Sequence, residues 1–144
     1  MRKYKVGYIA GVFDLFHIGH LNLFKRAKEL CDYLIVGVLV DDLSVKFKNK
    51  KPIIPFEQRI QIVESIKFVD KAVLVDLSSL DKMIAWEKYQ FDCLISGDDW
   101  KGNPIWEIEE ERLKKVGSEI VYLSYTESIS STQIRQSIEN NKDF

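Results

Sequence analysis

The sequence predicts an α/β fold of the Rossmann-like, doubly wound kind, with a five-stranded parallel sheet and helices on both faces. Short continuous apolar runs rich in valine and isoleucine, rather than alternating ones, are typical of strands buried on both faces. Segments of helical periodicity separate these runs, and this alternation implies right-handed crossovers in a parallel sheet. No linker, repeat or low-complexity tract interrupts the 144 residues, so a single domain over residues 1–144 is predicted.

Five short apolar runs are the expected strands. In chain order they are Lys5–Ala10, Tyr33–Val40, Ala72–Val75, Cys93–Ser96 and Ile120–Leu123. Apolar residues recur at helical spacing between them, in stripes formed by Leu21, Phe24, Ala27 and Leu30, then by Phe56, Ile60, Val63 and Ile66, and more weakly by Leu80, Met83 and Ile84. The charged run Glu107–Lys115 is expected to form a helix that closes at Gly117, and Ser130–Asn140 a last short helix.

Composition and charge are those of an ordinary globular protein. Hydrophobic residues make up 46% and charged residues 30%, and the formal net charge of −1 favours neither nucleic acid nor an anionic membrane as a partner. No apolar run reaches about 18 residues and no signal-peptide pattern is present, so a cytoplasmic protein without a membrane span is predicted. Cys31 and Cys93 lie inside apolar patterns, which fits two reduced, buried cysteines.

A ligand site is expected at the carboxyl ends of the strands, where the order of a doubly wound sheet reverses. Four predicted loops meet at this edge. They are Gly11–His20, Asp41–Pro55, Gly97–Trp106 and Ser124–Thr132, and they hold most of the chain's unusual residues.

The first of these loops contains the only two histidines of the chain, His17 and His20, at a strand-to-helix junction. A helix N-terminus favours anions through its free N–H groups and its dipole, and two imidazoles there can donate hydrogen bonds to a phosphate. Gly19 removes a side chain between them, so a phosphate can approach the backbone. The loop lacks the glycine patterns of dinucleotide-binding and phosphate-loop folds. No further Cys, His or carboxylate completes a zinc site.

The last loop offers a second phosphate-binding helix start. Ser130 and Gln133 are spaced as a capping box, which leaves the hydroxyls of Ser131 and Thr132 and further N–H groups for the outer phosphates of a nucleotide. Arg135, one turn further, is placed to reach the same charge.

Taken together, the stretch Gly-Val-Phe-Asp-Leu-Phe-His-Ile-Gly-His and the later Ile-Ser-Ser-Thr-x-Ile-Arg resemble the cytidylyltransferase branch of the nucleotidyltransferase superfamily. That superfamily carries a His-x-Gly-His motif and a late Ser/Thr-rich motif. The segments Gly97–Gly102 and Tyr125–Ser130 are similar to those of members that act on sn-glycerol 3-phosphate. The resemblance covers nearly the whole chain, from about residue 4 to 138.

The resemblance implies transfer of CMP from CTP to a phosphorylated alcohol, with sn-glycerol 3-phosphate the best match, giving a CDP-alcohol and pyrophosphate. The acceptor phosphate would attack the α-phosphorus directly, so catalysis would consist of positioning and charge stabilisation. The implied catalytic residues are His17, His20 and Lys48. The implied nucleotide-binding positions are Val12, Phe13, Asp14, Gly19, Gly97, Asp98, Asp99, Tyr125, Thr126, Ile129, Ser130, Ser131 and Thr132.

Acceptor binding is expected from cations, namely Lys46, Lys50, Arg59 and Lys82. Arg59 opens a helix and is expected to face either the acceptor phosphate or a neighbouring carboxylate. For the crowded lysines of the second loop, a solvated charge run is the alternative. Mg²⁺ is expected with the triphosphate, with Asp14 as a helper at one remove and no dedicated protein metal site.

The pair Asp98 and Asp99 is interpreted as binding cytosine or ribose, with a structural role as the alternative. The chain also departs from the family pattern: Val12 stands for a threonine, Tyr125 for an arginine that would bind the triphosphate, and Lys67 for another arginine. These changes remove one hydroxyl and one cation and alter a third group, because lysine does not replace arginine at a bidentate phosphate site.

Three other functions stay open. Lys50–Pro55 is similar to archaeal FAD synthetases, which suggests ATP and FMN as substrates. A phosphoethanolamine or phosphocholine cytidylyltransferase would differ only in its acceptor, and a nucleotide-sensing module would lack catalysis. The family resemblance implies a homodimer, and a CDP-glycerol product would serve the synthesis of cell-surface polymers.

Overall fold

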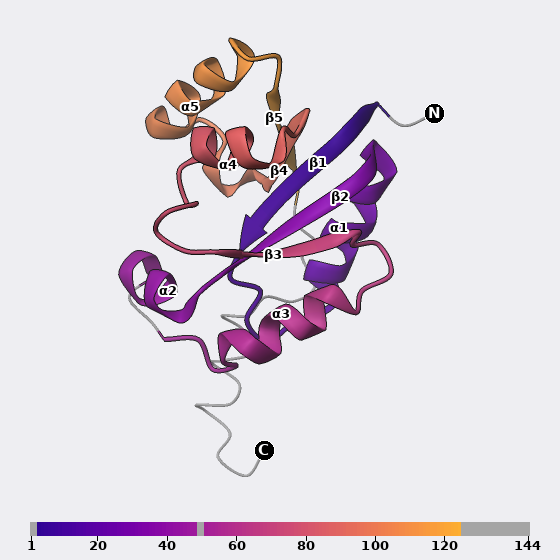
Figure 1. Ribbon diagram of the computed structural model, residues 1–144, viewed down its shortest axis with the longest axis vertical. Coiled ribbons are helices and arrows are strands. Elements are labelled where there is room, and N and C mark those ends of the chain that lie inside the picture. The colour runs from indigo at the N-terminus through magenta and orange to yellow at the C-terminus, as the bar shows by residue number, and fades with distance from the viewer. Residues whose placement is uncertain (1–2, 49–50, 125–144) are drawn as a thin grey trace.

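The computed structural model describes residues 3–48 and 51–124, and five strands within them form one sheet. The strands are β1 (Tyr4–Gly11), β2 (Cys31–Leu39), β3 (Lys71–Val75), β4 (Cys93–Gly97) and β5 (Glu119–Leu123). All neighbouring strands are parallel, and their order is β3-β2-β1-β4-β5. The predicted α/β fold with a five-stranded parallel sheet is confirmed (Figure 1).

Helices connect the strands in the described ranges, as the periodicity predicts. They are α1 (Ile18–Leu30), α2 (Asp41–Lys48), α3 (Phe56–Glu64), α4 (Lys82–Tyr89) and α5 (Pro104–Lys114), with a short 3-10 turn, η1, at Asp98–Trp100. The helix predicted for Glu107–Lys115 begins three residues earlier, because Asn103 caps it and Pro104 occupies its first turn. Gly117 follows it with φ +85°, the left-handed conformation expected of a glycine after a helix. The helix predicted for residues 130–140 lies outside the described residues.

The sheet is covered on both faces, which places two cores in the molecule. Phe24 and Ala27 of α1 and Val63 of α3 pack on one face against β2 and β1. Ala85 of α4 and Leu113 of α5 pack on the other. Figure 1 shows α4 and α5 together on one side and α1 and α3 on the opposite side. Since β1 and β4 are neighbours whose connections leave to opposite faces, the topological switch point lies between them.

The connection after β2 differs from its prediction. Residues 41–55 are expected as a loop, but the first eight of them form α2. Asp41 and Asp42 occupy its first turn, where carboxylates favour the helix dipole. Leu43 and Ser44 are buried against the protein and give the helix an inward face. The lysine-rich composition obscured this short amphipathic helix.

None of the helices in the described part of the chain has the length and apolar character needed to cross a bilayer.

Candidate active site at the carboxyl ends of β1 and β4

The turn between β1 and α1 has an unusual backbone. Phe13 and Leu15 have φ values of 53° and 50°, a left-handed conformation that costs a non-glycine residue about 1–3 kcal/mol. The Phe13 ring is buried and meets Phe24 edge-on, with 5.0 Å between ring centroids. A Cβ at Gly11 would lie 2.9 Å from the same ring, so this position requires glycine. The Phe13 ring therefore belongs to the core, and its contact with a nucleotide stays a prediction.

The two histidines form a reciprocal capping box at the start of α1. The backbone N–H of Gly19 donates to Nδ1 of His17 at 3.0 Å, and the backbone N–H of His17 donates to Nδ1 of His20 at 3.2 Å. The rings stack with centroids 3.9 Å apart and planes inclined by 24°. The predicted convergence of His17, Gly19 and His20 at this helix start is thus what the structure shows.

These hydrogen bonds assign the protons of the rings. A nitrogen that accepts an N–H bond carries no proton of its own, so each neutral ring holds its proton on Nε2. Burial lowers the pKa of His17 below its ordinary value, which favours the neutral ring. Protonation would also place a hydrogen on Nδ1 opposite the Gly19 N–H. Neutral His17 therefore offers an Nε2–H donor beside the positive end of the α1 dipole.

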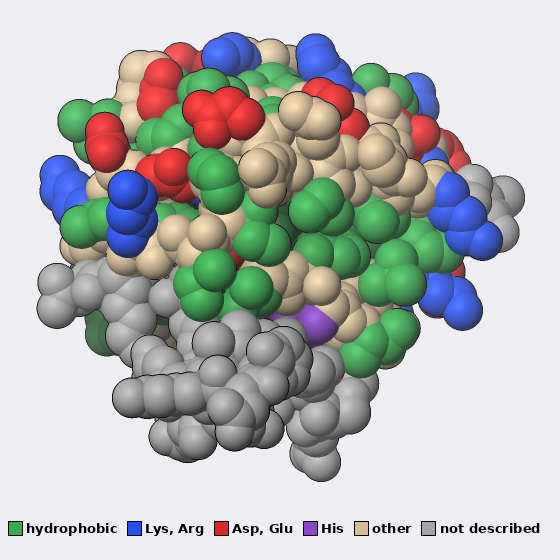
Figure 2. Space-filling view, turned by 90° about the horizontal axis from the view of Figure 1, so that it is seen from below, with side chains coloured by type: hydrophobic (Ala, Val, Ile, Leu, Met, Phe, Trp, Pro, Cys, Tyr) green, Lys and Arg blue, Asp and Glu red, His purple; other side chains and the backbone are tan. Residues whose placement is uncertain are grey.

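The histidine surface is visible at this edge of the sheet. Figure 2 shows it next to apolar and uncharged groups of the described residues, while most of the Lys and Arg side chains drawn there lie toward the margins. An imidazole N–H at the N-terminus of a helix suits a phosphate oxygen, since the ring and the helix dipole are both fixed before the ligand arrives.

The carboxyl end of β4 supplies the opposite side of the switch point. Gly97 is buried, whereas Asp98 and Asp99 are exposed in η1 directly after it. Trp100 stacks on Trp106, with centroids 5.4 Å apart and planes inclined by 10°. The tryptophan thus packs the turn, and both aspartates are exposed to solvent. Their role toward a nucleotide stays a prediction.

The predicted cations have different surroundings. Lys46 is exposed on α2, and Lys48 is the last residue of that helix. The Nζ of Lys82 lies 3.9 Å from the centroid of the Trp106 ring. Burial lowers the pKa of Lys82, and the charges of Glu109 and Asp81 oppose this shift. Its predicted contact with an acceptor phosphate would require the ammonium to turn away from the tryptophan.

Arg59 faces a carboxylate. Its side chain is fully buried and makes an ion pair with Asp41 at 2.5 Å, together with hydrogen bonds to three backbone carbonyls. The structure thus shows the alternative that the sequence left open, a neighbouring carboxylate, and this burial argues against a direct contact with the acceptor. Sequence reasoning missed Asp41 itself, whose only signal is a carboxylate just beyond a buried strand.

Asp14 is also buried, and its carboxylate accepts the backbone N–H groups of Ile53 and Ile54 at 2.9 Å each. In the described ranges no group of three or more His, Cys, Asp or Glu side chains is arranged to hold a metal ion. The predicted Mg²⁺ and the helper role of Asp14 stay predictions.

Several predicted site residues lie outside the described part of the chain. They are Lys50, Tyr125, Thr126, Ile129, Ser130, Ser131 and Thr132.

A doubly wound parallel sheet with paired imidazoles at the first helix start defines the nucleotidyltransferase-like class of Rossmann folds. Within that class, a family model described as Cytidylyltransferase-like matches residues 8–137, and the chain belongs to this family. The prediction of a cytidylyltransferase enzyme is confirmed by this match and by the relatives that follow.

The relatives with the name glycerol-3-phosphate cytidylyltransferase include two that match most of the chain. The protein from Bacillus spizizenii is 40% identical over 126 residues, which cover 88% of this chain and 91% of the relative. The protein from Staphylococcus aureus is 38% identical over 128 residues, covering 89% and 90%. Among solved structures, a lipopolysaccharide core biosynthesis protein from Thermoplasma volcanium matches with a TM-score of 0.73 and 28% identity, over 86% of this chain and 99% of that one.

Proposed function

We propose that the protein transfers CMP from CTP to a phosphorylated alcohol, with sn-glycerol 3-phosphate as the physiological acceptor. The observation that carries the chemistry is the histidine capping box, in which both Nδ1 atoms accept backbone N–H groups, so that the protons of the neutral rings lie on Nε2 at a helix start. The acceptor is supported by the names of the relatives, which match almost the full length of the chain.

The reaction needs no covalent intermediate. An oxygen of the acceptor phosphate forms a bond to the α-phosphorus of CTP while the bond from that phosphorus to the bridging oxygen of the β-phosphate breaks, and pyrophosphate leaves with the electron pair. The acceptor phosphate is already ionised, so no strong base is required. The enzyme's contribution is to align the two phosphates and to stabilise the charge on the equatorial oxygens.

Each group in the site has a proposed part in this step. The Nε2–H groups of His17 and His20 donate to the phosphate oxygens of the transition state, and Lys48, with Lys46 beside it on α2, neutralises the α-phosphate and the incoming phosphate. Asp98 and Asp99 bind the cytosine or ribose. The residues 125–132 bind the outer phosphates. Bound Mg²⁺ would neutralise part of the triphosphate charge.

The active form is proposed to be a homodimer in the cytoplasm, and its product to be a precursor for cell-surface polymers. Oligomeric state is open to light scattering on the purified protein.

The test is a substrate matrix read out as pyrophosphate release. The protein is incubated with CTP or ATP and Mg²⁺, and with glycerol 3-phosphate, phosphoethanolamine, phosphocholine or FMN. Pyrophosphate release is expected only for the combination of CTP with glycerol 3-phosphate, and mass spectrometry should identify the product as CDP-glycerol. Release with CTP and phosphoethanolamine or phosphocholine instead would replace the acceptor. Release with ATP and FMN but not CTP would overturn the cytidylyl assignment, and silence in all combinations would favour a nucleotide-sensing module.

A further inference from the structure

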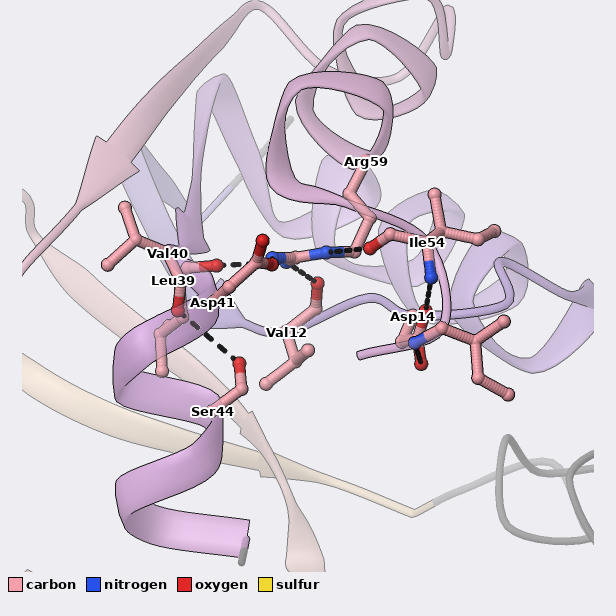
Figure 3. A network of polar contacts seen from close by, with 9 residues as sticks. Val12, Asp14, Leu39, Val40, Asp41, Ser44, Ile54 and Arg59 are labelled. Atoms are coloured by element: carbon pink, nitrogen blue, oxygen red, sulfur yellow. Dashed lines mark hydrogen bonds and ion pairs between the residues drawn. The ribbon is translucent and has the colours of Figure 1, made fainter. Parts of the chain in front are cut away.

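The largest fully buried side chain of the described residues is a cation, Arg59 of α3. A buried guanidinium is tolerated only when its donors are paired. Its Nε donates to the carbonyl of Ile54 at 2.8 Å, and its Nη1 donates to the carbonyls of Val12 at 2.7 Å and Leu39 at 2.9 Å. Its Nη2 is paired with Asp41 at 2.5 Å. Figure 3 shows the guanidinium at the centre of these partners.

The four partners of Arg59 belong to three segments of the chain. Val12 lies in the β1–α1 turn that leads to the histidines. Leu39 ends β2, and Asp41 opens α2, the helix that carries Lys46 and Lys48. Ile54 lies just before α3, so one rigid planar group holds three segments of chain together.

Asp14 closes the same arrangement from the other side. It follows Val12 by two residues in the histidine turn and accepts the N–H groups of Ile53 and Ile54. The histidine turn is therefore tied to residues 53–54 directly, through Asp14, and indirectly, through Arg59. Figure 3 shows Arg59 and Asp14 both bonded to the labelled Ile54.

We propose that Arg59 is a positioning residue, which with Asp14 and Asp41 fixes the distance between the histidine turn and helix α2. This inference rests on the proposed function, since it assigns to Arg59 the alignment of the histidine donors with the lysines of α2. Arg59 itself touches no substrate.

Two physical features support this role. The histidine turn contains two left-handed non-glycine residues, Phe13 and Leu15, and such a strained turn persists only where the surrounding contacts over-determine it. The helix α2 is only eight residues long, so the anchor at Asp41 dictates where its last turn lies. A lysine at position 59 could not reproduce the arrangement, because its ammonium lacks the planar fork of four simultaneous donors used here.

The test uses Arg59→Lys and Asp41→Asn, with Val63→Ala as the matched control. Val63 is fully buried one turn further along α3 and belongs to the apolar core, so its truncation destabilises the same helix without removing any hydrogen bond made by Arg59, Asp41 or Asp14. Turnover is measured with CTP and glycerol 3-phosphate well below each variant's melting temperature. Hydrogen exchange at the amides of residues 42–46, 53 and 54 is measured in parallel.

The kcat of Arg59→Lys is expected to fall about 100-fold, the effect of roughly a 1 Å misplacement of reacting groups. The KM for CTP should change less than about threefold, because the lost alignment matters most in the transition state. Asp41→Asn should show the same pattern with a smaller loss, and exchange at residues 53 and 54 should rise in Arg59→Lys. Val63→Ala should lower the melting temperature and leave kcat within about twofold.

Equal kcat values for Asp41→Asn and Val63→Ala would overturn the proposal. Unchanged hydrogen exchange at residues 53 and 54 in both Arg59→Lys and Asp41→Asn would overturn it as well. If Arg59→Lys does not fold, Asp41→Asn alone carries the kinetic test. Absence of turnover in the wild-type protein would refute the proposed function, and the exchange measurement would still decide whether Arg59 fixes the segments.

Discussion

Helix α1 and helix α5 are both capped by side chains, but only the cap of α1 also provides a hydrogen-bond donor for a ligand. Asn103 accepts the N–H groups of Ile105 and Trp106 through its amide oxygen, and its work is confined to the helix. His17 and His20 cap α1 through Nδ1, and the opposite nitrogen of the neutral His17 ring, Nε2, is a donor. Imidazole is the only capping group with two separated nitrogens in one rigid ring. The comparison shows how one residue can serve both the fold and the ligand.

The same comparison explains why the histidines are so firmly held. A reciprocal cap fixes the orientation of both rings, and their stacking at 3.9 Å fixes them against each other. The His20 ring also meets Phe13 edge-on at 5.6 Å between centroids. Donors fixed in this way need little reorganisation when charge develops on a phosphate.

The most direct test of the comparison between α1 and α5 keeps the helix cap at His17 and removes its Nε2–H donor. Asparagine is a good N-cap, so His17→Asn should retain the thermal stability of the wild type while losing Nε2–H. Its kcat should fall by about 10²–10³-fold, the usual loss for one donor to a developing oxyanion. His17→Ala should lose the same turnover and also about 1 kcal/mol of stability.

Steady-state kinetics and urea unfolding on the two variants provide the measurement. Near-normal turnover in His17→Asn would show that His17 is only a cap. Equal stability of the two variants would show that its cap contributes nothing.

The pH dependence of stability is the next largest effect. The pKa of His17 is lowered in the folded protein, so between that value and its ordinary pKa near 6.5 the unfolded chain binds more protons. Stability should therefore rise with pH across this window and be lost as the pH falls through it. Urea unfolding from pH 5 to 8 measures the slope, and the difference between wild type and His17→Asn isolates the contribution of His17. An identical slope in both proteins would contradict the assignment.

The sequence allowed the histidine pair to be predicted because its signal is local. Two rare titratable residues and a glycine within four positions, placed after an apolar run, already imply a phosphate site. The sheet was predictable for a related reason, since each strand is a short apolar run that can be recognised without its neighbours. Sites built from adjacent residues are visible in a single sequence.

The hydrogen-bond network around Arg59 was not predictable, because the partners of Arg59 lie far apart in the sequence. Its bonds to Val12, Leu39 and Asp41 span 47, 20 and 18 residues. An arginine among lysines is more readily interpreted as another phosphate ligand, and nothing local shows that this one is buried. Helix α2 was missed for the same reason, since only its short inward face distinguishes it from a solvated lysine loop.

The converse of the histidine experiment removes a cap that has no second function. Asn103→Ala leaves two N–H groups of α5 without their acceptor and should cost about 1 kcal/mol of stability. Turnover should stay within about twofold of the wild type, because the change affects only the helix start. Thermal unfolding measures the change in stability, and steady-state kinetics measure the change in kcat. A large loss of turnover at unchanged stability would show that the start of α5 has a part in catalysis after all.

The smallest expected effect concerns the start of α4, where Lys82 lies over Trp106. A cation over an indole ring contributes about 0.5–1 kcal/mol at a partly exposed site, so Lys82→Met should lower stability by no more than this. If the ammonium leaves the ring to bind the acceptor phosphate, the same variant should raise the KM for glycerol 3-phosphate and leave the KM for CTP unchanged. Initial rates over a grid of both substrates separate the two constants. Equal KM values in wild type and variant would show that Lys82 only packs against Trp106, just as Asn103 only caps α5. Of the three helix starts compared, the start of α1 with its two histidines would then be the one that acts on the ligand.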